Sequence, residues 1–386
     1  MPKNTQDYKT SLSGRLMSNI YIIYRAMFNL DGTLTTIGGI ENYILNLTEV
    51  LSLQGWKCHL VQPAKEPFMF ETSHVNVHGV STGFFRGNLK KFALAKWVQI
   101  NADKKKDIII YATDSYAVNL SGYKQIAIQH GISWDKPRKA NNSFIQFTSS
   151  LLNHCKYLSY IKNNSTLVCV DHNFINWYRT WFNVGNKKVK IIYNFYNEKI
   201  SNSDFEKKWN NNSEIKIIIA RRFVDYRGID LIAPIIKRLL PQHKIQVSFA
   251  GDGPLKPYLE SLFANDSNVD IMQYGPDDSF KVHKEHHIAI IPTLGSEGTS
   301  LSMIEAMAAG CMVLSSNIGG LSNLIIDGYN GSLVMPTSQD MEQALSSALN
   351  NVDLCKKLAK NGLNSITLPC AKDTWSKGWI DVINNQ

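Results

Sequence analysis

The chain has 386 residues, which is the usual length of two domains. Apolar residues make up 44% and charged residues 19%, as in globular proteins with buried cores, and no apolar run approaches the ~20 residues that span a bilayer. The six cysteines are scattered without a Cys-x-x-Cys pair, which argues against a disulfide framework or a zinc ribbon. This cysteine usage and a polar stretch over residues 1–18, without a secretory signal, predict a cytoplasmic protein.

The charge is unevenly distributed along the chain. Residues 1–195 hold 23 Lys and Arg against 11 Asp and Glu, a net charge of +12, within an overall charge of +9. The first half therefore suits an anionic partner. A cationic, amphipathic stretch from Phe84 to Trp97 suits an anionic membrane surface on the inner face of the plasma membrane, and the alternative is a helix that packs on its own sheet. No motif typical of nucleic-acid binding accompanies the charge, so we expect no nucleic-acid partner.

Strand-like runs alternate with helical ones, and the alternation restarts after the middle of the chain. In the first half we expect a helix over 39–55 and strands over 19–27, 56–62, 107–112, 125–129, 166–170 and 188–192. In the second half we expect helices over 229–240 and 374–385 and strands over 214–220, 245–250, 269–273, 288–292 and 311–315.

This alternation predicts an α/β protein with two Rossmann-like, doubly wound parallel-sheet domains. The expected domains are 1–195 and 214–370, followed by a C-terminal helix over 371–386. The polar, aperiodic residues 196–213 are expected to be a linker between the domains. Ligands of such sheets bind at the carboxyl ends of the strands, in the crevice between the domains.

The most informative segment is residues 295–310, which follow the expected strand 288–292. Glu297 lies in a loop of small residues, and Glu305 lies in the opening turns of an alanine-rich helix. A strand, a tight loop and a helix start present backbone N–H groups and a positive dipole to an anion. The expected N–H donors are Gly298, Thr299, Ser300 and Leu301. The alternative interpretation is that Ser302 and Glu305 only form a capping box.

Three further sets of residues follow expected strands. Arg222 and Arg227 follow the first strand of the second half, and a solvated basic loop is the alternative. Gly38 and Gly39, after Thr36 and Ile37, open the first helix, where glycines allow close approach to phosphate and a plain turn is the alternative.

The third set is His130-Gly131, at the end of the strand 125–129, where a histidine without a role is the alternative. Asp171 and His172 also follow a strand and are expected to face either an acceptor or solvent. His283, His286 and His287 are expected at an exposed helix end rather than in a zinc site. We expect no metal and no cofactor, because no Asp-x-Asp precedes a strand end.

Three segments agree in order and spacing with one known family: Glu297-x7-Glu305 with Ala-Met-Ala-Ala-Gly after it, Ser315–Gly320, and Asp327–Gly331. Together they resemble the large family-four group of retaining glycosyltransferases with the GT-B fold, of the type found in bacterial polysaccharide synthesis. The resemblance implies that the C-terminal helix packs back on the first domain. It covers most of the chain and is strongest over residues 214–335.

The resemblance also implies roles for single residues. Glu297 would contact the hydroxyls of a donor sugar, and Glu305 those of a ribose. Arg222 and Arg227 would clamp the donor diphosphate, with Arg227 in place of the family's lysine and Arg221 in place of its glycine. Gly38 and Gly39 would face the same diphosphate, and His130 would contact the sugar near the reacting carbon. Asn194 matches a position near the hinge, without the family's Pro and Gly.

The function implied is retaining transfer of a hexose-type sugar from a nucleotide diphosphate sugar, with UDP favoured, to a hydroxyl of an acceptor. The acceptor would be a glycan or a polyprenyl-diphosphate-linked glycan of an O-antigen, lipopolysaccharide or capsule pathway. The reaction would proceed by front-face displacement without a metal. The alternatives are a GT-B-fold nucleotide-sugar epimerase or phosphorylase, and a non-catalytic nucleotide-sugar-binding partner in a polysaccharide-assembly complex.

Overall fold

The computed structural model describes residues 18–35, 38–132, 165–181, 188–210 and 214–386, together with positions 135, 144, 148, 151, 152 and 183. Most of the polar residues 1–18, and Thr36 and Ile37, lie outside the described residues. By its contacts the chain divides into two compact units. One comprises Met1–Ile128, Ser159–Leu167 and Ile380–Gln386, and the other comprises Gln129–Leu158 and Val168–Trp379.

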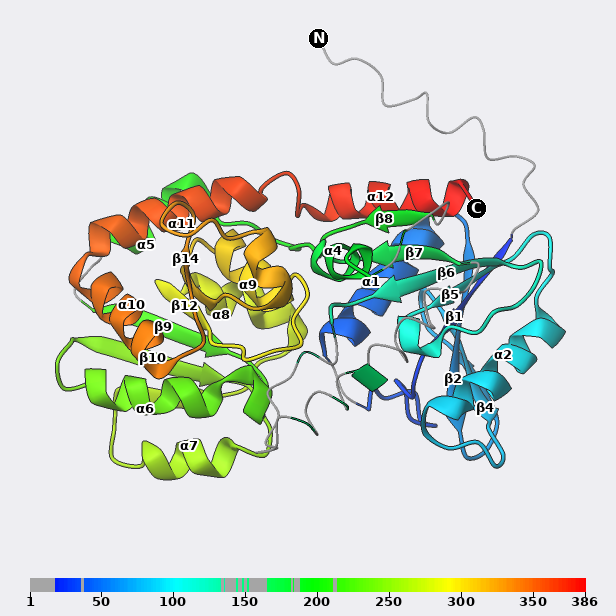
Figure 1. Cartoon of the computed structure of the whole chain (residues 1–386), viewed down its shortest axis with the longest axis horizontal. Coiled ribbons are helices and arrows are strands. Elements are labelled where there is room, and N and C mark those ends of the chain that lie inside the picture. The colour runs from blue at the N-terminus through cyan, green and yellow to red at the C-terminus, as the bar shows by residue number, and fades with distance from the viewer. Residues whose placement is uncertain are drawn as a thin grey trace, which may run out of the picture. The chain divides into compact units, whose positions relative to one another are not determined.

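The first sheet has eight strands in the order β3-β4-β2-β1-β5-β6-β7-β8 (Figure 1). Its strands are β1 (Asn19–Ile23), β2 (Lys57–Ala64), β3 (Phe68–Glu71), β4 (Asn76–Ser81), β5 (Ile108–Tyr111), β6 (Lys124–Gln129), β7 (Thr166–Cys169) and β8 (Val189–Ile191). Its helices are α1 (Gly39–Leu53), α2 (Lys90–Asn101) and α4 (Asn173–Arg179). The neighbouring pairs from β4 to β6 are parallel, and β3 is an antiparallel edge strand.

The second sheet has six strands in the order β11-β10-β9-β12-β13-β14, and all of its pairs are parallel. Its strands are β9 (Ile215–Ala220), β10 (Ile245–Ala250), β11 (Val269–Met272), β12 (Ile288–Ile291), β13 (Met312–Ser316) and β14 (Ser332–Val334). The helices of this part are α5 (Asn202–Asn210), α6 (Ile229–Leu239), α7 (Lys256–Leu262), α8 (Ser279–Lys284), α9 (Leu301–Ala308), α10 (Ser338–Asn350), α11 (Val352–Ile366) and α12 (Lys372–Asn384).

The central strand β9 explains why this sheet is covered on both faces. Ile217 and Ile219 belong to one apolar core, and Ile218 between them belongs to another. Successive side chains of a strand point to opposite faces, so an unbroken apolar run requires helices on both sides. The cores contain α6 and α10 on one face and α9 on the other. The fold predicted from the alternation, an α/β protein with two parallel sheets, is therefore confirmed.

Two segments differ from the expectation. The hairpin of β3 and β4, joined by a short Thr72–Val75 turn, lies in a part of the chain for which no element was predicted. The expected linker contains α5, whose Phe205 and Trp209 are fully buried. The Trp209 indole donates to the carbonyl of Gly310 at 3.0 Å, which fixes α5 against the second sheet. The helix was not predicted because its sequence is polar apart from these two buried side chains, which lie one helical turn apart.

No helix among the described residues is long and apolar enough to cross a membrane.

Candidate active site

The candidate site lies at the carboxyl ends of β9 and β12, which are neighbours in the second sheet. After β12 the chain turns through residues 292–300 and enters α9. Ser300 caps this helix, since its hydroxyl accepts from the N–H of Met303 at 3.4 Å. Ser302 instead donates to the carbonyl of Ala220 at 3.0 Å, so the alternative capping box of Ser302 and Glu305 is wrong.

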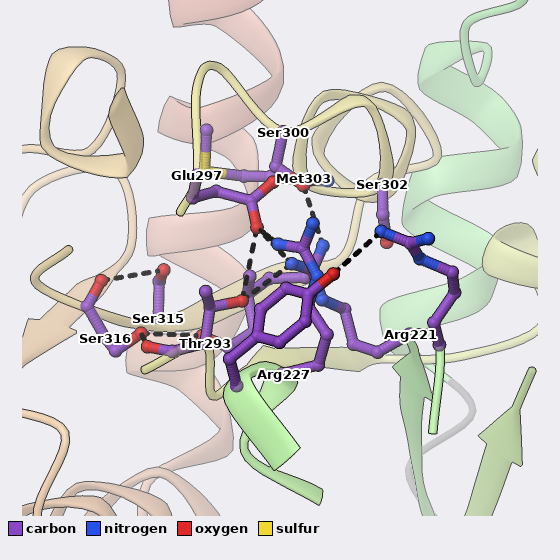
Figure 2. Close-up of polar contacts among 12 residues, drawn as sticks. Arg221, Arg227, Thr293, Glu297, Ser300, Ser302, Met303, Ser315 and Ser316 are labelled. Atoms are coloured by element: carbon purple, nitrogen blue, oxygen red, sulfur yellow. Dashed lines mark hydrogen bonds and ion pairs between the residues drawn. The ribbon is translucent and has the colours of Figure 1, made fainter. Parts of the chain in front are cut away.

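Glu297 is held by two arginines. Arg221, directly after β9, and Arg227, in the turn before α6, each form a short ion pair with Oε2 of Glu297 (Figure 2). Thr293 donates to the same oxygen at 3.3 Å. The three charged side chains are 6%, 15% and 9% exposed, in the order Arg221, Arg227, Glu297. Two guanidinium groups on one carboxylate leave one positive charge in excess in a buried place.

This excess charge is held at a cost. Burial lowers the pKa of Arg227, and the charge of Arg221 lowers it further. Burial also lowers the pKa of Arg221, to about 10, with the charge of Arg222 acting in the same direction. Guanidinium groups remain protonated in proteins, so the buried excess charge is not removed by loss of a proton. The site should instead attract an anion that compensates this charge. The adjacent start of α9 adds a positive dipole end.

Close backbone packing fixes the loop that carries Glu297. Modelling a Cβ on Gly298 would place it 2.8 Å from Val170 Cγ2 and 3.0 Å from both Asp171 Oδ2 and the His130 carbonyl oxygen. A Cβ on Gly319, which has a φ of +54°, would lie 2.2 Å from the carbonyl oxygen of Glu297. Only glycines fit these approaches. The residue before Glu297, Ser296, is itself left-handed with a φ of 58°, a strained conformation at a functional loop.

Thr299 ties the same loop to two other segments. Its hydroxyl donates to the carbonyl of Val170 at 2.8 Å, and its carbonyl accepts a short hydrogen bond from the Asn194 side chain. The Asn194 N–H reaches the Thr299 hydroxyl at 3.2 Å. Asn194 therefore orients the loop without either a proline or a glycine beside it.

Asp171 is fully buried beside this loop, so the alternative that it faces solvent is wrong, whereas His172 is exposed. One of its oxygens accepts from the N–H groups of Asn173 and Phe174, at the start of α4. Burial raises the pKa of Asp171 to about 6, and these two N–H groups partly oppose the shift.

Glu305 faces a different set of groups. Ser279 of α8 donates to Oε2 of Glu305 at 2.7 Å. Burial raises the pKa of Glu305, and this hydrogen bond partly opposes the shift. Burial, and next the Glu305 charge, raise the pKa of the nearby Tyr274 hydroxyl. A carboxylate, a hydroxyl and a phenol thus gather at the end of β11 and the side of α9.

The structure places the other expected residues as follows. Arg222 is exposed and donates to the Tyr226 hydroxyl at 3.1 Å, so it does not join the Glu297 cluster. His130 and Gly131 pass directly over the loop, since a Cβ on Gly131 would lie 2.7 Å from the Gly298 nitrogen. Gly298, Thr299, Ser300 and Leu301 form the loop and first turn of α9, as expected.

Gly38 and Gly39 lie in the first unit, at the start of α1. Gly38 is the N-cap, and its N–H donates to Oε2 of Glu41 at 3.1 Å. The other oxygen of Glu41 accepts from the Tyr24 hydroxyl at 2.7 Å and from Arg25 at 2.8 Å. The buried carboxylate of Glu41 therefore binds the first N–H of the helix start through one oxygen and the more exposed Arg25 through the other.

The expectation that His283, His286 and His287 are exposed was wrong. His283, His286 and His287 are buried, and each has its own partner: the Ser279 carbonyl at 2.8 Å, the Ser248 hydroxyl at 2.9 Å and the Lys208 carbonyl at 3.1 Å. They hold α8 and β12 in place. Among the described residues, no group of three His, Cys, Asp or Glu side chains is arranged to hold a metal ion.

Sequence reasoning missed Thr293 and predicted no contact within the site for Arg221 or Asn194. The only signal was the pair Arg221-Arg222, of which the pattern selected the second. The pattern does not tell which of two adjacent arginines points into the site. In the structure it is Arg221, which is buried, whereas Arg222 is exposed.

Two family models match the chain. One, described as "Glycosyltransferase Family 4", matches residues 37–199, and the other, described as "Glycosyl transferases group 1", matches residues 201–365. Among solved structures, an Anabaena protein, HepE, in complex with UDP-glucose is similar, with a TM-score of 0.69 and 15% identity. That match covers 95% of this chain and 100% of that one. The chain thus has the GT-B fold.

The matches to curated relatives cover only part of this chain and part of each relative. An uncharacterized glycosyltransferase of Methanocaldococcus jannaschii is 26% identical over 52% of this chain and 54% of its own length. The lipopolysaccharide 1,2-N-acetylglucosaminetransferase of Salmonella typhimurium is 30% identical over 32% of this chain and 36% of its own length. The chain thus spans about half or less of the length of these relatives.

Proposed function

Because the chain carries a Glycosyltransferase Family 4 domain followed by a glycosyl transferases group 1 domain, we propose that it is a retaining hexosyltransferase. It uses a nucleotide diphosphate sugar, with a UDP-sugar favoured, and needs neither a metal nor a cofactor. The acceptor is a hydroxyl of a glycan or of a polyprenyl-diphosphate-linked glycan in surface polysaccharide synthesis. The lipopolysaccharide enzyme of Salmonella typhimurium and the UDP-glucose complex of HepE support these choices by analogy.

One observation carries the proposal: the buried, net positive cluster of Arg221, Arg227 and Glu297 at the start of α9. A leaving diphosphate gains negative charge as the glycosidic bond breaks. Cations and helix N-terminal amides already in place stabilise that charge without reorganising in the transition state. A bound diphosphate would also neutralise the excess charge that burial makes costly.

The residues then have distinct roles. Arg227, assisted by the exposed Arg222 and by the amides of Gly298 to Leu301, binds the diphosphate. Glu297 accepts hydrogen bonds from the donor sugar, and every side-chain contact that it makes with described residues falls on Oε2 rather than Oε1. Glu305 accepts from the ribose hydroxyls, as an ionised carboxylate binds a diol. His130, beside Gly298, contacts the sugar, and Gly38 and Gly39 approach the diphosphate.

The chemical step is a substitution at the anomeric carbon with net retention. The bond from that carbon to the diphosphate oxygen breaks as the acceptor oxygen forms its bond on the same face. The acceptor proton passes to the departing diphosphate oxygen. The protein contributes charge stabilisation and positioning rather than a general base.

A donor screen tests the proposal. The purified chain is combined with UDP-, GDP-, ADP- and dTDP-sugars, and thermal stabilisation and slow nucleotide release are followed. We expect one sugar nucleotide to stabilise the fold and to be slowly hydrolysed. Stabilisation with release of an epimerised sugar nucleotide, or of sugar phosphate in added phosphate, would indicate the epimerase or phosphorylase alternative.

Substitution of Arg227 tests the site directly. Arg227→Ala should lower the rate of nucleotide release by ~10²–10³-fold, the usual effect of losing one preorganised donor to a developing anion. Arg238→Ala is the matched control, since Arg238 pairs with Glu342 on the exposed side of α6. Equal rates for the Arg227 variant and the control would refute the diphosphate role. Binding without turnover in the unmodified chain, with every acceptor tried, would favour a non-catalytic partner.

A further inference from the structure

Arg221 occupies a position that the family pattern reserves for glycine, yet its side chain enters the centre of the site. We propose that Arg221 is a positioning residue that holds Glu297 in the orientation that receives the donor sugar. This leaves Arg227 as the guanidinium that moves to the diphosphate. This inference rests on the proposed function. It gives the two arginines different roles: Arg221 stays bound to Glu297, and Arg227 exchanges Glu297 for the diphosphate.

The contacts of Arg221 mark it as the fixed member. Its Nη1 donates to the Ser300 hydroxyl at 3.0 Å, and its Nη2 donates to the Thr293 hydroxyl at 2.6 Å and to Glu297. These three partners belong to one continuous segment, from the end of β12 to the cap of α9. A planar guanidinium with several donors bridges such a segment in one geometry, which a lysine cannot do.

Arg227 is held differently. Among the described residues its ion-pair partner is Glu297 alone. Tyr226 also contacts it: the guanidinium lies 5.0 Å from the centre of the Tyr226 ring, and a side-chain hydrogen bond with Tyr226 partly opposes the lowering of the Arg227 pKa by burial. Its side chain is 15% exposed, against 6% for Arg221. An arriving diphosphate can therefore replace Glu297 as the partner of Arg227. Arg221 would have to break three contacts to move. Its Nε is buried and has no hydrogen-bond partner among the described residues.

The division has a consequence for Glu297. If both arginines followed the diphosphate, Glu297 would keep only the 3.3 Å contact from Thr293 and its carboxylate would be free to turn. With Arg221 in place, Oε2 stays fixed and Oε1 keeps its direction. Arg221 should thus matter for recognition of the sugar, and Arg227 for recognition of the nucleotide.

The test separates these two kinds of binding. Affinities for UDP and for the sugar nucleotide selected by the donor screen are measured for the unmodified chain, Arg221→Met and Arg227→Met. We expect Arg221→Met to bind UDP within about twofold of the unmodified chain but to lose the extra affinity that the sugar confers. Its turnover should fall by ~10²-fold, as expected for a misplaced contact. Arg227→Met should instead weaken UDP itself.

A variant with Arg221→Lys keeps the charge but not the three directed contacts, and provides a second measurement if Arg221→Met does not fold. We expect it to bind UDP normally and to recover only part of the sugar affinity. Adding Glu297→Gln to Arg221→Met should produce little further loss of sugar affinity, because the two residues act as one unit.

The outcomes distinguish the two levels of the argument. If the unmodified chain binds no sugar nucleotide, the proposed function fails. If it does bind one, and Arg221→Met or Arg221→Lys loses UDP affinity as Arg227→Met does, Arg221 is a phosphate ligand and the positioning role is overturned. Unchanged sugar affinity and turnover in both Arg221 variants would overturn it as well.

Discussion

Glu305 shows at the scale of one residue how this site opposes stability. It has a hydrogen bond from Ser279, but no ion pair involves it among the described residues, whereas Glu297 has two arginines. Burial therefore raises the pKa of Glu305 above its ordinary value of 4.5. The ionised form of Glu305 is less favourable in the folded chain than in the unfolded chain. The ribose contact proposed for Glu305 would explain why the chain keeps a carboxylate that lowers its stability.

The sign of the resulting pH dependence follows from linkage. A carboxyl whose folded pKa is raised does not affect stability below its unfolded pKa, and it destabilises the fold increasingly as the pH rises above that value. We therefore predict that Glu305→Gln raises the melting temperature at pH 8 and that this gain shrinks as the pH falls towards 4.5. Thermal unfolding of both chains between pH 4.5 and pH 8 measures the difference.

Glu342→Gln is the matched control for that experiment. Arg238 lowers the pKa of Glu342 through a hydrogen bond on the exposed surface, so this substitution removes a small stabilising interaction instead. Its effect should be a slight loss of stability, within the ~1 kcal/mol of exposed ion pairs. A loss of stability at pH 8 in Glu305→Gln would show that the carboxylate is better compensated than its surroundings indicate.

The residues of the site were predictable to different degrees. Glu297 and Glu305 were found because their spacing and the helix start can be read from the chain. Arg221 was missed because its partners Thr293 and Ser300 lie 72 and 79 positions further along the chain, and the local pattern does not show which of two adjacent arginines meets them. Asn194 was given little weight because its neighbours depart from the pattern, while its contacts with Thr299 are made over 105 positions of sequence.

At the scale of elements, the site depends on how closely the loop before α9 can approach its neighbours. Gly298 contacts the ends of two strands of the first sheet, and Gly320 donates to the Glu297 carbonyl at 3.0 Å. An added Cβ on Gly298 would meet the side chains of Val170 and Asp171 as well as the carbonyl oxygen of His130, whereas one on Gly319 would meet only backbone atoms of Glu297. The position of Glu297 is therefore set by backbone packing as much as by its ion pairs.

We predict that Gly298→Ala displaces this loop. Its Cβ would meet Val170 at 2.8 Å and the carbonyl oxygen of His130 at 3.0 Å, so the chain should lose ~1–3 kcal/mol of stability and most of its turnover. Chemical unfolding and nucleotide release from the selected sugar nucleotide measure the two effects.

Gly378→Ala is the control, because Gly378 lies within α12 and its added Cβ would make ordinary contacts of 3.4 Å or more with Ile192. Replacing a helical glycine by alanine should stabilise the chain by ~0.5–1 kcal/mol and leave turnover unchanged. Full activity in Gly298→Ala would mean that the loop can move without harm.

The elements themselves were predicted well where their hydrophobic pattern is long. The isoleucine-rich strands β9 and β12 appear within one residue of their expected ends. The pattern failed for α5, where only Phe205 and Trp209 face a core, and for the short β3, whose side chains alternate between partly buried and exposed. Both are decided by what they pack against rather than by their own composition.

At the scale of the molecule, part of the excess positive charge of the first half lies beside exposed aromatic residues before and at the start of α2. Phe84, Phe85, Leu89 and Phe92 are exposed in the turn before α2 and on its first turn. Arg86, Lys90 and Lys96 lie in the same segment, in which Arg86 and Lys96 are exposed. Exposed aromatic side chains beside cations are typical of a surface that rests on anionic lipid headgroups.

We therefore predict that the purified chain binds vesicles with anionic lipid but not neutral vesicles, and that binding weakens as salt shortens the screening length. Phe84→Ser with Phe85→Ser should reduce binding through lost insertion. Lys90→Gln with Lys96→Gln should reduce it through charge, by ~1 kcal/mol for each lysine.

The control, Lys207→Gln with Lys244→Gln, removes the same charge from exposed positions of the second half and should have little effect. Sedimentation with vesicles measures all four chains. Equal loss in both lysine pairs would mean that only total charge matters, and binding indifferent to lipid charge would refute the membrane role.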